Sequence, residues 1–132
     1  MEIMTNLNLV RLEAVSFVAT LCLGVTPWAY AGQSGADLYD QECGDCHSLA
    51  QPPKNKKGPS LRGIMGKQAG AASNFAYSAA LRTANIVWTA ETMDAYIRSP
   101  KVVVAGGGKM KYDGLSSAAE RAAIIQFLIE QK

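Results

Sequence analysis

The sequence predicts a small all-α domain whose helices are joined by long loops. Helical signals mark residues 36–47, 89–99 and 117–131, where apolar side chains recur at helical spacing. Alternation of the β type is confined to residues 102–104, so no sheet is expected. Residues 48–70 are rich in glycine and proline and have no sustained period, which predicts a loop wrapped over something bulky.

Residues 1–31 of this 132-residue chain have the pattern of a secretory signal peptide. Arg11 precedes an apolar run at 14–25, and Ala29-Tyr30-Ala31 supplies a small-x-small cleavage site. A retained membrane anchor is the alternative, but the run is shorter than the roughly 18–20 residues of a spanning helix. We therefore expect a signal peptide at 1–31 and one exported domain at 32–132, in a bacterial periplasm.

Charge and cysteine content exclude some function classes. The chain has 13 basic and 11 acidic residues, a formal net charge of +2. No basic run alternates with aromatic residues, so nucleic acid is not an expected partner. Cys22 lies in the apolar run and would be removed with it, leaving Cys43 and Cys46. A domain this small usually needs a covalent or metal staple beyond its own core.

The first predicted helix, 36–47, carries the residues that suggest a cofactor. Asp37 and Asp40 lie early in it, where acidic side chains complement the helix dipole. One face of the helix carries a stripe at i, i+4, i+8 and i+11: Gly35, Tyr39, Cys43 and Cys46.

The run Cys43-Gly44-Asp45-Cys46-His47 is the attachment motif of c-type haem. Each of the two thiols can add to a vinyl group of the porphyrin, and the adjacent imidazole can then face the iron. His47 is the only histidine in the chain. The sequence thus predicts one covalently attached haem c per chain, with Cys43, Cys46 and His47 among the residues that bind it.

Three interpretations without haem compete for the cysteine pair. A structural zinc site needs four ligands, usually two such pairs. A thioredoxin-like redox pair belongs in a βαβ context, which the sequence does not predict. A disulfide within one turn closes almost no loop and would stabilise little. Haem attachment accounts better for the motif, the export signal and the small size together.

Two further helices are expected before the last one. Residues 78–83 predict a short helix. Residues 89–99 predict a longer one, with Thr89 as its N-cap and Pro100 as its stop. Residues 101–114 are expected to be irregular.

The last helix, 117–131, has the clearest signals in the chain. Ser117 and Glu120 form a capping box at its start. Its apolar stripe consists of Ile124, Phe127 and Leu128.

A second axial ligand for the iron has to be sought among the methionines, because no second histidine exists. Met93 lies at helical spacing with Ile97, which is typical of core packing. Met65 lies in the glycine-rich loop, and its role stays open. Met110 follows a glycine-rich segment far along the chain from His47, as a ligand for the opposite haem face should.

The exported part of the chain resembles the small class I c-type cytochromes, such as bacterial cytochrome c2 and mitochondrial cytochromes c. The resemblance covers residues 35–132 and implies a small cytochrome c-type fold, with crossing N- and C-terminal helices and loops wrapped around one covalently bound haem. It is carried by Gly35-x-x-x-Tyr39-x-x-x-Cys43-x-x-Cys46-His47, Gly58-Pro59-Ser60-Leu61-x-Gly63, Tyr77, Trp88, Tyr96, Gly108-Lys109-Met110 and the helix at 124–128.

Roles in the cofactor site follow from this resemblance. It implies thioether bonds at Cys43 and Cys46, and axial iron ligation by His47 and Met110. The carbonyl of Pro59 would accept a hydrogen bond from the imidazole of His47 and fix its tautomer.

The resemblance also assigns roles to aromatic residues. Tyr77 and Trp88 would donate hydrogen bonds to the propionates, and Tyr96 would lie near the methionine sulfur. Tyr39 would pack against Phe127 where the terminal helices cross. Tyr112 would flank the haem edge, where many relatives have phenylalanine.

Three positions depart from the family pattern. Lys67 stands where many relatives have an arginine near a propionate, and keeps the charge without the bidentate geometry. Leu81 replaces a polar asparagine of the mitochondrial branch, and Gly108 replaces a common threonine. These departures predict a methionine loop that is weaker than in mitochondrial relatives.

The resemblance implies an electron carrier rather than an enzyme, with His/Met-ligated iron cycling between Fe(III) and Fe(II). It would serve an exported respiratory, photosynthetic or dehydrogenase-linked chain as a monomer without membrane insertion. Its expected partners are redox proteins: a quinol–cytochrome c oxidoreductase-type donor, and a terminal oxidase, reaction centre or dehydrogenase.

A set of lysines either steers the carrier to an acidic partner or only keeps it soluble: Lys54, Lys56, Lys57, Lys109 and Lys111.

Two other functions remain open. One is a haem peroxidase or ligand-binding haem protein with a labile methionine. The other is an electron-accepting subunit of a dehydrogenase or oxidase complex.

Overall fold

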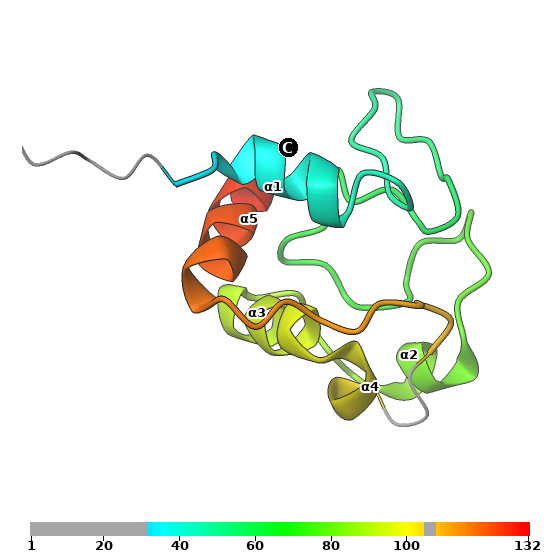
Figure 1. Ribbon diagram of the computed structural model, residues 1–132. Helices are drawn as coiled ribbons and strands as arrows, with labels where there is room; N and C mark the ends of the chain where they lie inside the picture. The colour runs from blue at the N-terminus through cyan, green and yellow to red at the C-terminus, as the bar shows by residue number, and fades with distance from the viewer. Residues whose placement is uncertain (1–31, 105–107) are drawn as a thin grey trace, which may run out of the picture. The chain divides into compact units, whose positions relative to one another are not determined.

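The computed structural model describes residues 32–104 and 108–132, so the predictions about the signal peptide and Cys22 lie outside it. The helices of this part are α1 (Gly35–Glu42), α2 (Ala79–Thr83), α3 (Ala90–Arg98), α4 (Pro100–Val103) and α5 (Ala118–Glu130) (Figure 1). In these residues the only β-type pairing is an isolated bridge between Gln68 and Val87. The predicted all-α fold is confirmed.

Helix α1 ends earlier than the sequence predicted. The N–H groups of Cys43 and Gly44 both donate to the carbonyl oxygen of Tyr39, at 2.8 and 2.9 Å, and close the helix after Glu42. A Cβ at Gly44 would lie 2.7 Å from the carbonyl oxygen of Asp40, so this ending requires glycine. The prediction of a helix through His47 was therefore wrong, because glycine in the motif ends it.

The C-x-x-C-H motif forms a compact turn after α1. The N–H groups of Cys46 and His47 both donate to the carbonyl of Cys43, at 3.1 and 2.9 Å. This turn brings both cysteines and the histidine to one side, as helical spacing also would have done.

Helices α1 and α5 cross in close contact, as predicted (Figure 1). A Cβ at Gly35 would lie 2.9 Å from the Cβ of Phe127 and would overlap the carbonyl oxygen of Ala123. The rings of Tyr39 and Phe127 pack at 5.6 Å with an interplanar angle of 50°. The small residue in α1 thus permits the crossing, and the aromatic pair fills the space beside it.

Helix α5 supplies the inner face of the core. Its Ile124 and Leu128 are 0% and 1% exposed. At its start, the hydroxyl oxygen of Ser117 accepts a hydrogen bond from the N–H of Glu120 at 3.4 Å, one half of the predicted capping box. The predicted apolar stripe is therefore packed in the core, and the predicted N-cap is present without its reciprocal bond from Glu120.

The start of α5 is also joined to α3 by an ion pair that the sequence did not suggest. Arg121 is 5% exposed, and its Nε lies 2.7 Å from a carboxylate oxygen of Asp94. The same guanidinium donates to the carbonyl oxygens of Leu115 and Ser116. These bonds satisfy a charge that would otherwise be costly to bury.

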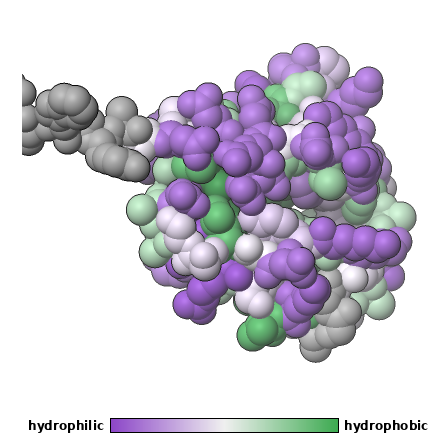
Figure 2. Space-filling model, viewed as in Figure 1, coloured by the Kyte–Doolittle hydropathy of each residue, from purple (hydrophilic) through white to green (hydrophobic). Residues whose placement is uncertain are grey.

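Thr89 is the N-cap of helix α3, as predicted, and forms a reciprocal capping box with Thr92. Pro100 does follow α3, but it also opens α4, a single turn that the sequence analysis missed. One turn is too short to produce a periodic pattern, and proline is well tolerated at the first position of a helix. Figure 2 shows a mostly hydrophilic face with an apolar patch over α4, where Val102 is 80% exposed.

The segment between α1 and α2 contains no helix, as predicted for residues 48–70. Backbone hydrogen bonds attach it to the rest of the domain, from Gly63 N–H to Gln131 O at 2.6 Å and from Gly66 N–H to Trp88 O at 2.8 Å. No helix in the described part is long and apolar enough to cross a membrane.

Candidate functional site

One cavity of about 320 Å³ lies between the motif turn, the loop after it, α3 and residues 108–112. Every site residue predicted from the sequence lines it: Cys43, Cys46, His47, Pro59, Tyr77, Trp88, Tyr96 and Met110. The tertiary structure therefore brings together residues that are spread over 68 positions of the chain, from 43 to 110.

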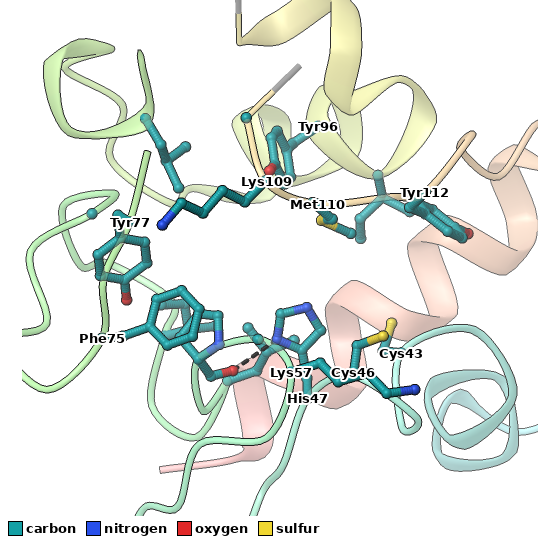
Figure 3. Close-up of a pocket in the computed structure, with 18 of the residues that line it drawn as sticks. Cys43, Cys46, His47, Lys57, Phe75, Tyr77, Tyr96, Lys109, Met110 and Tyr112 are labelled. Atoms are coloured by element: carbon teal, nitrogen blue, oxygen red, sulfur yellow. Dashed lines mark hydrogen bonds between the residues drawn. The ribbon is translucent and has the colours of Figure 1, made fainter. Parts of the chain in front are cut away.

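His47 is buried in one wall of the cavity with a defined orientation. Its Nδ1 lies 2.7 Å from the carbonyl oxygen of Pro59. Because a carbonyl only accepts, Nδ1 carries the proton and Nε2 keeps a free lone pair. Figure 3 shows this second nitrogen facing across the cavity toward the side of Met110. The predicted contact with Pro59 is present.

The surroundings of His47 favour a neutral imidazole. Burial lowers its pKa, and the nearby Lys56 ammonium lowers it further, against the opposite effect of the bond to Pro59. Gly58 lies against the ring, since a Cβ there would be 2.5 Å from the imidazole Cε1. A neutral ring with a free nitrogen is the form that binds iron.

The two cysteines lie beside His47 at the same wall (Figure 3). They form no disulfide with each other; Cys43 is half-buried and Cys46 is exposed at the cavity. Burial raises the pKa of the Cys43 thiol to about 12, and the neighbouring Glu42 carboxylate adds to this effect. Two thiols facing one apolar space suit two thioether bonds to a flat macrocycle.

Met110 lies on the opposite side of the cavity, with its sulfur facing the space in front of His47 (Figure 3). Met93, on α3, also lines the cavity, but it is 5% exposed and belongs to the hydrophobic core of the domain. Met65 packs against the core and does not line the cavity. The prediction that Met93 is a core residue is confirmed. Of the other two methionines, Met110 lines the cavity and Met65 does not.

Aromatic side chains form the remaining walls. Trp88 and Tyr96 are buried and pack at 5.0 Å. Tyr77 is buried against Phe75 at 4.9 Å, and burial raises the pKa of the Tyr77 phenol. Burial also raises the pKa of Tyr96. These phenols therefore remain protonated donors at neutral pH. Phe75 was missed, because a single aromatic residue in a loop gives no signal in the sequence.

Two of the departures from the family pattern are visible in the cavity. Leu81 presents an apolar side chain to it. Gly108 has a φ of +56°, a conformation that disfavours threonine. Lys67 is exposed and does not line the cavity, so the expectation that it lies near a propionate is not supported.

The five lysines named from the sequence divide into two groups. Lys57, Lys109 and Lys111 line the cavity, whereas Lys54 and Lys56 do not. The ammonium of Lys56 donates to the carbonyl of Gly44, and that of Lys109 donates to the carbonyl of Ala76 at 2.8 Å. Whether the set steers the carrier to a partner or only keeps it soluble therefore stays a prediction, with Lys57, Lys109 and Lys111 as the members at the cavity.

Glu42 and Tyr112 form a contact across the cavity wall that the sequence did not reveal. The Tyr112 hydroxyl donates to a carboxylate oxygen of Glu42 at 2.8 Å. Burial and this hydrogen bond raise the pKa of Tyr112. No sequence signal links these residues, because 70 positions separate them.

The donor set of the cavity fits haem c better than a bare metal ion. Two thiols and an imidazole nitrogen share one wall, a thioether faces them, and the remaining lining is largely apolar. Nowhere in 32–104 and 108–132 do three or more His, Cys, Asp or Glu side chains gather as a zinc site would require.

Comparison with known proteins also indicates a haem c protein. A family model described as cytochrome c matches residues 32–132. Cytochrome c type-1 of Ascaris suum is 38% identical over 99 residues, which is 75% of this chain and 87% of that protein. Cytochrome c 2.1 of Caenorhabditis elegans is 38% identical over 96 residues, 73% and 85% of the two chains. Cytochrome c of Sesamum indicum is 34% identical over 98 residues, 74% and 87%.

Proposed function

Since the chain belongs to the cytochrome c family, we propose that it shuttles single electrons within an exported bacterial redox chain, with His47 and Met110 as the axial ligands of its iron. Membership makes it a monohaem electron-transfer protein with covalently attached haem c, and not an enzyme. The two thioether bonds are assigned to Cys43 and Cys46.

The observation that carries the ligand assignment is the opposition of His47 and Met110 across one cavity. Haem c supplies a one-electron Fe(III)/Fe(II) couple when bound. If both side chains bind the iron, no coordination position would be left for a substrate, which suits electron transfer rather than catalysis. Methionine ligation also raises the reduction potential relative to ligation by two nitrogens.

The other cavity residues hold these ligands and the cofactor in place. The carbonyl of Pro59 orients the ring of His47. Tyr77 and Trp88 are assigned as donors to the propionates, and Tyr96 as the phenol near the sulfur of Met110. Their burial keeps water away from the iron ligands.

The partner is a redox protein, as in the family. An acidic docking surface on this partner suits the cations that face the cavity, Lys57 and Lys111. A quinol-oxidising complex as donor, and a terminal oxidase, reaction centre or dehydrogenase as acceptor, would fit this role. Export to the periplasm is supported by the signal-like pattern of residues 1–31.

The proposal is tested on protein purified from the periplasm of a bacterium that attaches haem c. We expect an intact mass equal to residues 32–132 plus one haem, and a pyridine haemochrome spectrum typical of two thioethers. The ferric spectrum should be low-spin, with the long-wavelength charge-transfer band of a methionine–iron bond. A high-spin ferric spectrum at neutral pH would contradict the ligand assignment, and a stably co-purifying subunit would contradict a free shuttle.

A further inference from the structure

Residues 108–113, the methionine segment, are attached to the domain in an unusual way. No backbone hydrogen bond joins this segment to any other residue that the structure describes. The first such bond after it is from Leu115 N–H to Ile97 O at 3.0 Å. Met110 therefore lies in a stretch that depends on side-chain contacts for its position.

Three side-chain hydrogen bonds connect the methionine segment to other parts of the domain. Asp113 pairs with Lys101, but these side chains are 96% and 62% exposed, and such pairs contribute little. Lys109 is exposed and donates to a neutral backbone carbonyl, that of Ala76. Tyr112 is half-buried and donates to the carboxylate of Glu42 at 2.8 Å. Partial burial and the charged acceptor make this bond the strongest of the three.

Glu42 is well placed to act as an anchor. It is the last residue of α1 and directly precedes Cys43. Helix α1 is itself packed firmly against α5. Figure 3 shows Tyr112 on the side of Met110, at the end of the cavity where the cysteines lie. The hydrogen bond therefore joins the two walls that carry the proposed iron ligands.

We propose that Tyr112 is a positioning residue for Met110, and that its hydrogen bond to Glu42 holds the methionine segment against the cofactor. This inference rests on the proposed function, because it assumes that Met110 ligates the iron. The ring of Tyr112 lines the cavity and would pack there without its hydroxyl. Phenylalanine, which the resemblance implies for many relatives, packs in this way but cannot donate to Glu42.

Competition by imidazole tests this role in the ferric holoprotein. Imidazole replaces the methionine at the iron, so its apparent Kd reports how firmly Met110 is held. We expect Tyr112→Phe to lower this Kd about tenfold, as the loss of one hydrogen bond to a charged acceptor should. Glu42→Gln should also lower the Kd for imidazole, but to a smaller extent, because the amide oxygen can still accept a hydrogen bond from the Tyr112 hydroxyl.

The two substitutions should not act independently. In the Tyr112→Phe background, Glu42→Gln should change the Kd less than twofold, because the bond is already absent. Asp40→Asn is the matched control, since it removes the same charge from an exposed position of α1 and should leave the Kd unchanged.

The outcomes separate this inference from the proposed function. An unchanged Kd in Tyr112→Phe, or fully additive effects of the two substitutions, overturns the positioning role while His/Met ligation stands. A wild-type ferric protein without the methionine–iron band overturns both. If Tyr112→Phe folds poorly, the comparison of Glu42→Gln with Asp40→Asn still decides, because equal Kd values in these two variants overturn the role.

Discussion

Tyr39 carries a buried hydroxyl that has no hydrogen-bond partner among the described residues. Burial raises the pKa of this phenol to about 12, with smaller effects of the same sign from Cys43 and Asp40, so it stays protonated. The ring, in contrast, packs well against Phe127. The ring of Tyr39 therefore stabilises the fold through its packing, whereas its unpaired hydroxyl destabilises it.

We predict that Tyr39→Phe stabilises the protein by about 1 kcal/mol, because it removes an unsatisfied buried donor and keeps the ring contact. Chemical denaturation of the holoprotein, followed by far-UV circular dichroism, measures the change. Tyr77→Phe is not expected to stabilise, since that phenol is assigned to the cofactor. A loss of stability in Tyr39→Phe would show that the hydroxyl is bonded, for example to buried water.

Met110 is the proposed second iron ligand, and its substitution tests the proposed carrier function most directly. We predict that Met110→Ala converts the ferric iron to a high-spin or water-ligated form and lowers the reduction potential, by a change on the order of 0.1 V. Absorption spectroscopy and redox titration measure both effects. Met65→Ala, at a methionine outside the cavity, is the matched control and should keep the low-spin spectrum. A Met110→Ala protein with an unchanged spectrum would rule out this ligand.

The crossing of α1 and α5 depends on the absence of a side chain at residue 35. A Cβ at this position would overlap the carbonyl oxygen of Ala123. We predict that Gly35→Ala destabilises the protein by about 2 kcal/mol, because backbone atoms cannot move aside as a flexible side chain does. Gly32→Ala is the control, with open space at its Cβ, and should change the stability very little. Equal stabilities of the two variants would contradict the close crossing.

The attachment of α5 to α3 depends on one buried charge. We predict that Arg121→Met destabilises the protein by about 3 kcal/mol, because Asp94 loses its partner and two backbone carbonyls lose their donor. Lys101→Met breaks an exposed ion pair and should cost less than about 0.5 kcal/mol. Thermal or urea denaturation measures both changes. A small loss in Arg121→Met would mean that packing of the methylene groups outweighs the ion pair.

For the whole molecule, the proposed role of the lysines at the cavity is to guide it to an acidic partner. We predict that Lys57→Glu with Lys111→Glu slows electron exchange with an acidic redox partner about tenfold at low salt, and much less at high salt. Lys54→Glu with Lys132→Glu makes the same net change away from the cavity and should have a smaller effect. Stopped-flow kinetics at several ionic strengths measure these rates. Equal slowing by the two pairs would show that only net charge matters.

Much of the fold could be predicted from local signals. The caps at Ser117 and Thr89 and the loop at 48–70 are present. The crossing of Tyr39 with Phe127, which is also present, was implied by the family resemblance and not by a local signal. The end of α1 could not be placed, because two N–H groups share the carbonyl of Tyr39 there. Helix α4 was missed because one turn has no period.

The sequence by itself determined the cofactor, because the spacing of Cys43, Cys46 and the only histidine is a local covalent property, and it offered that histidine as the expected iron ligand. Only the tertiary structure decided which methionine faces His47, since that choice depends on how distant segments meet around a cavity. The tertiary structure also decided the hydrogen bond between Tyr112 and Glu42. These two residues lie too far apart in the chain for any periodic pattern to connect them.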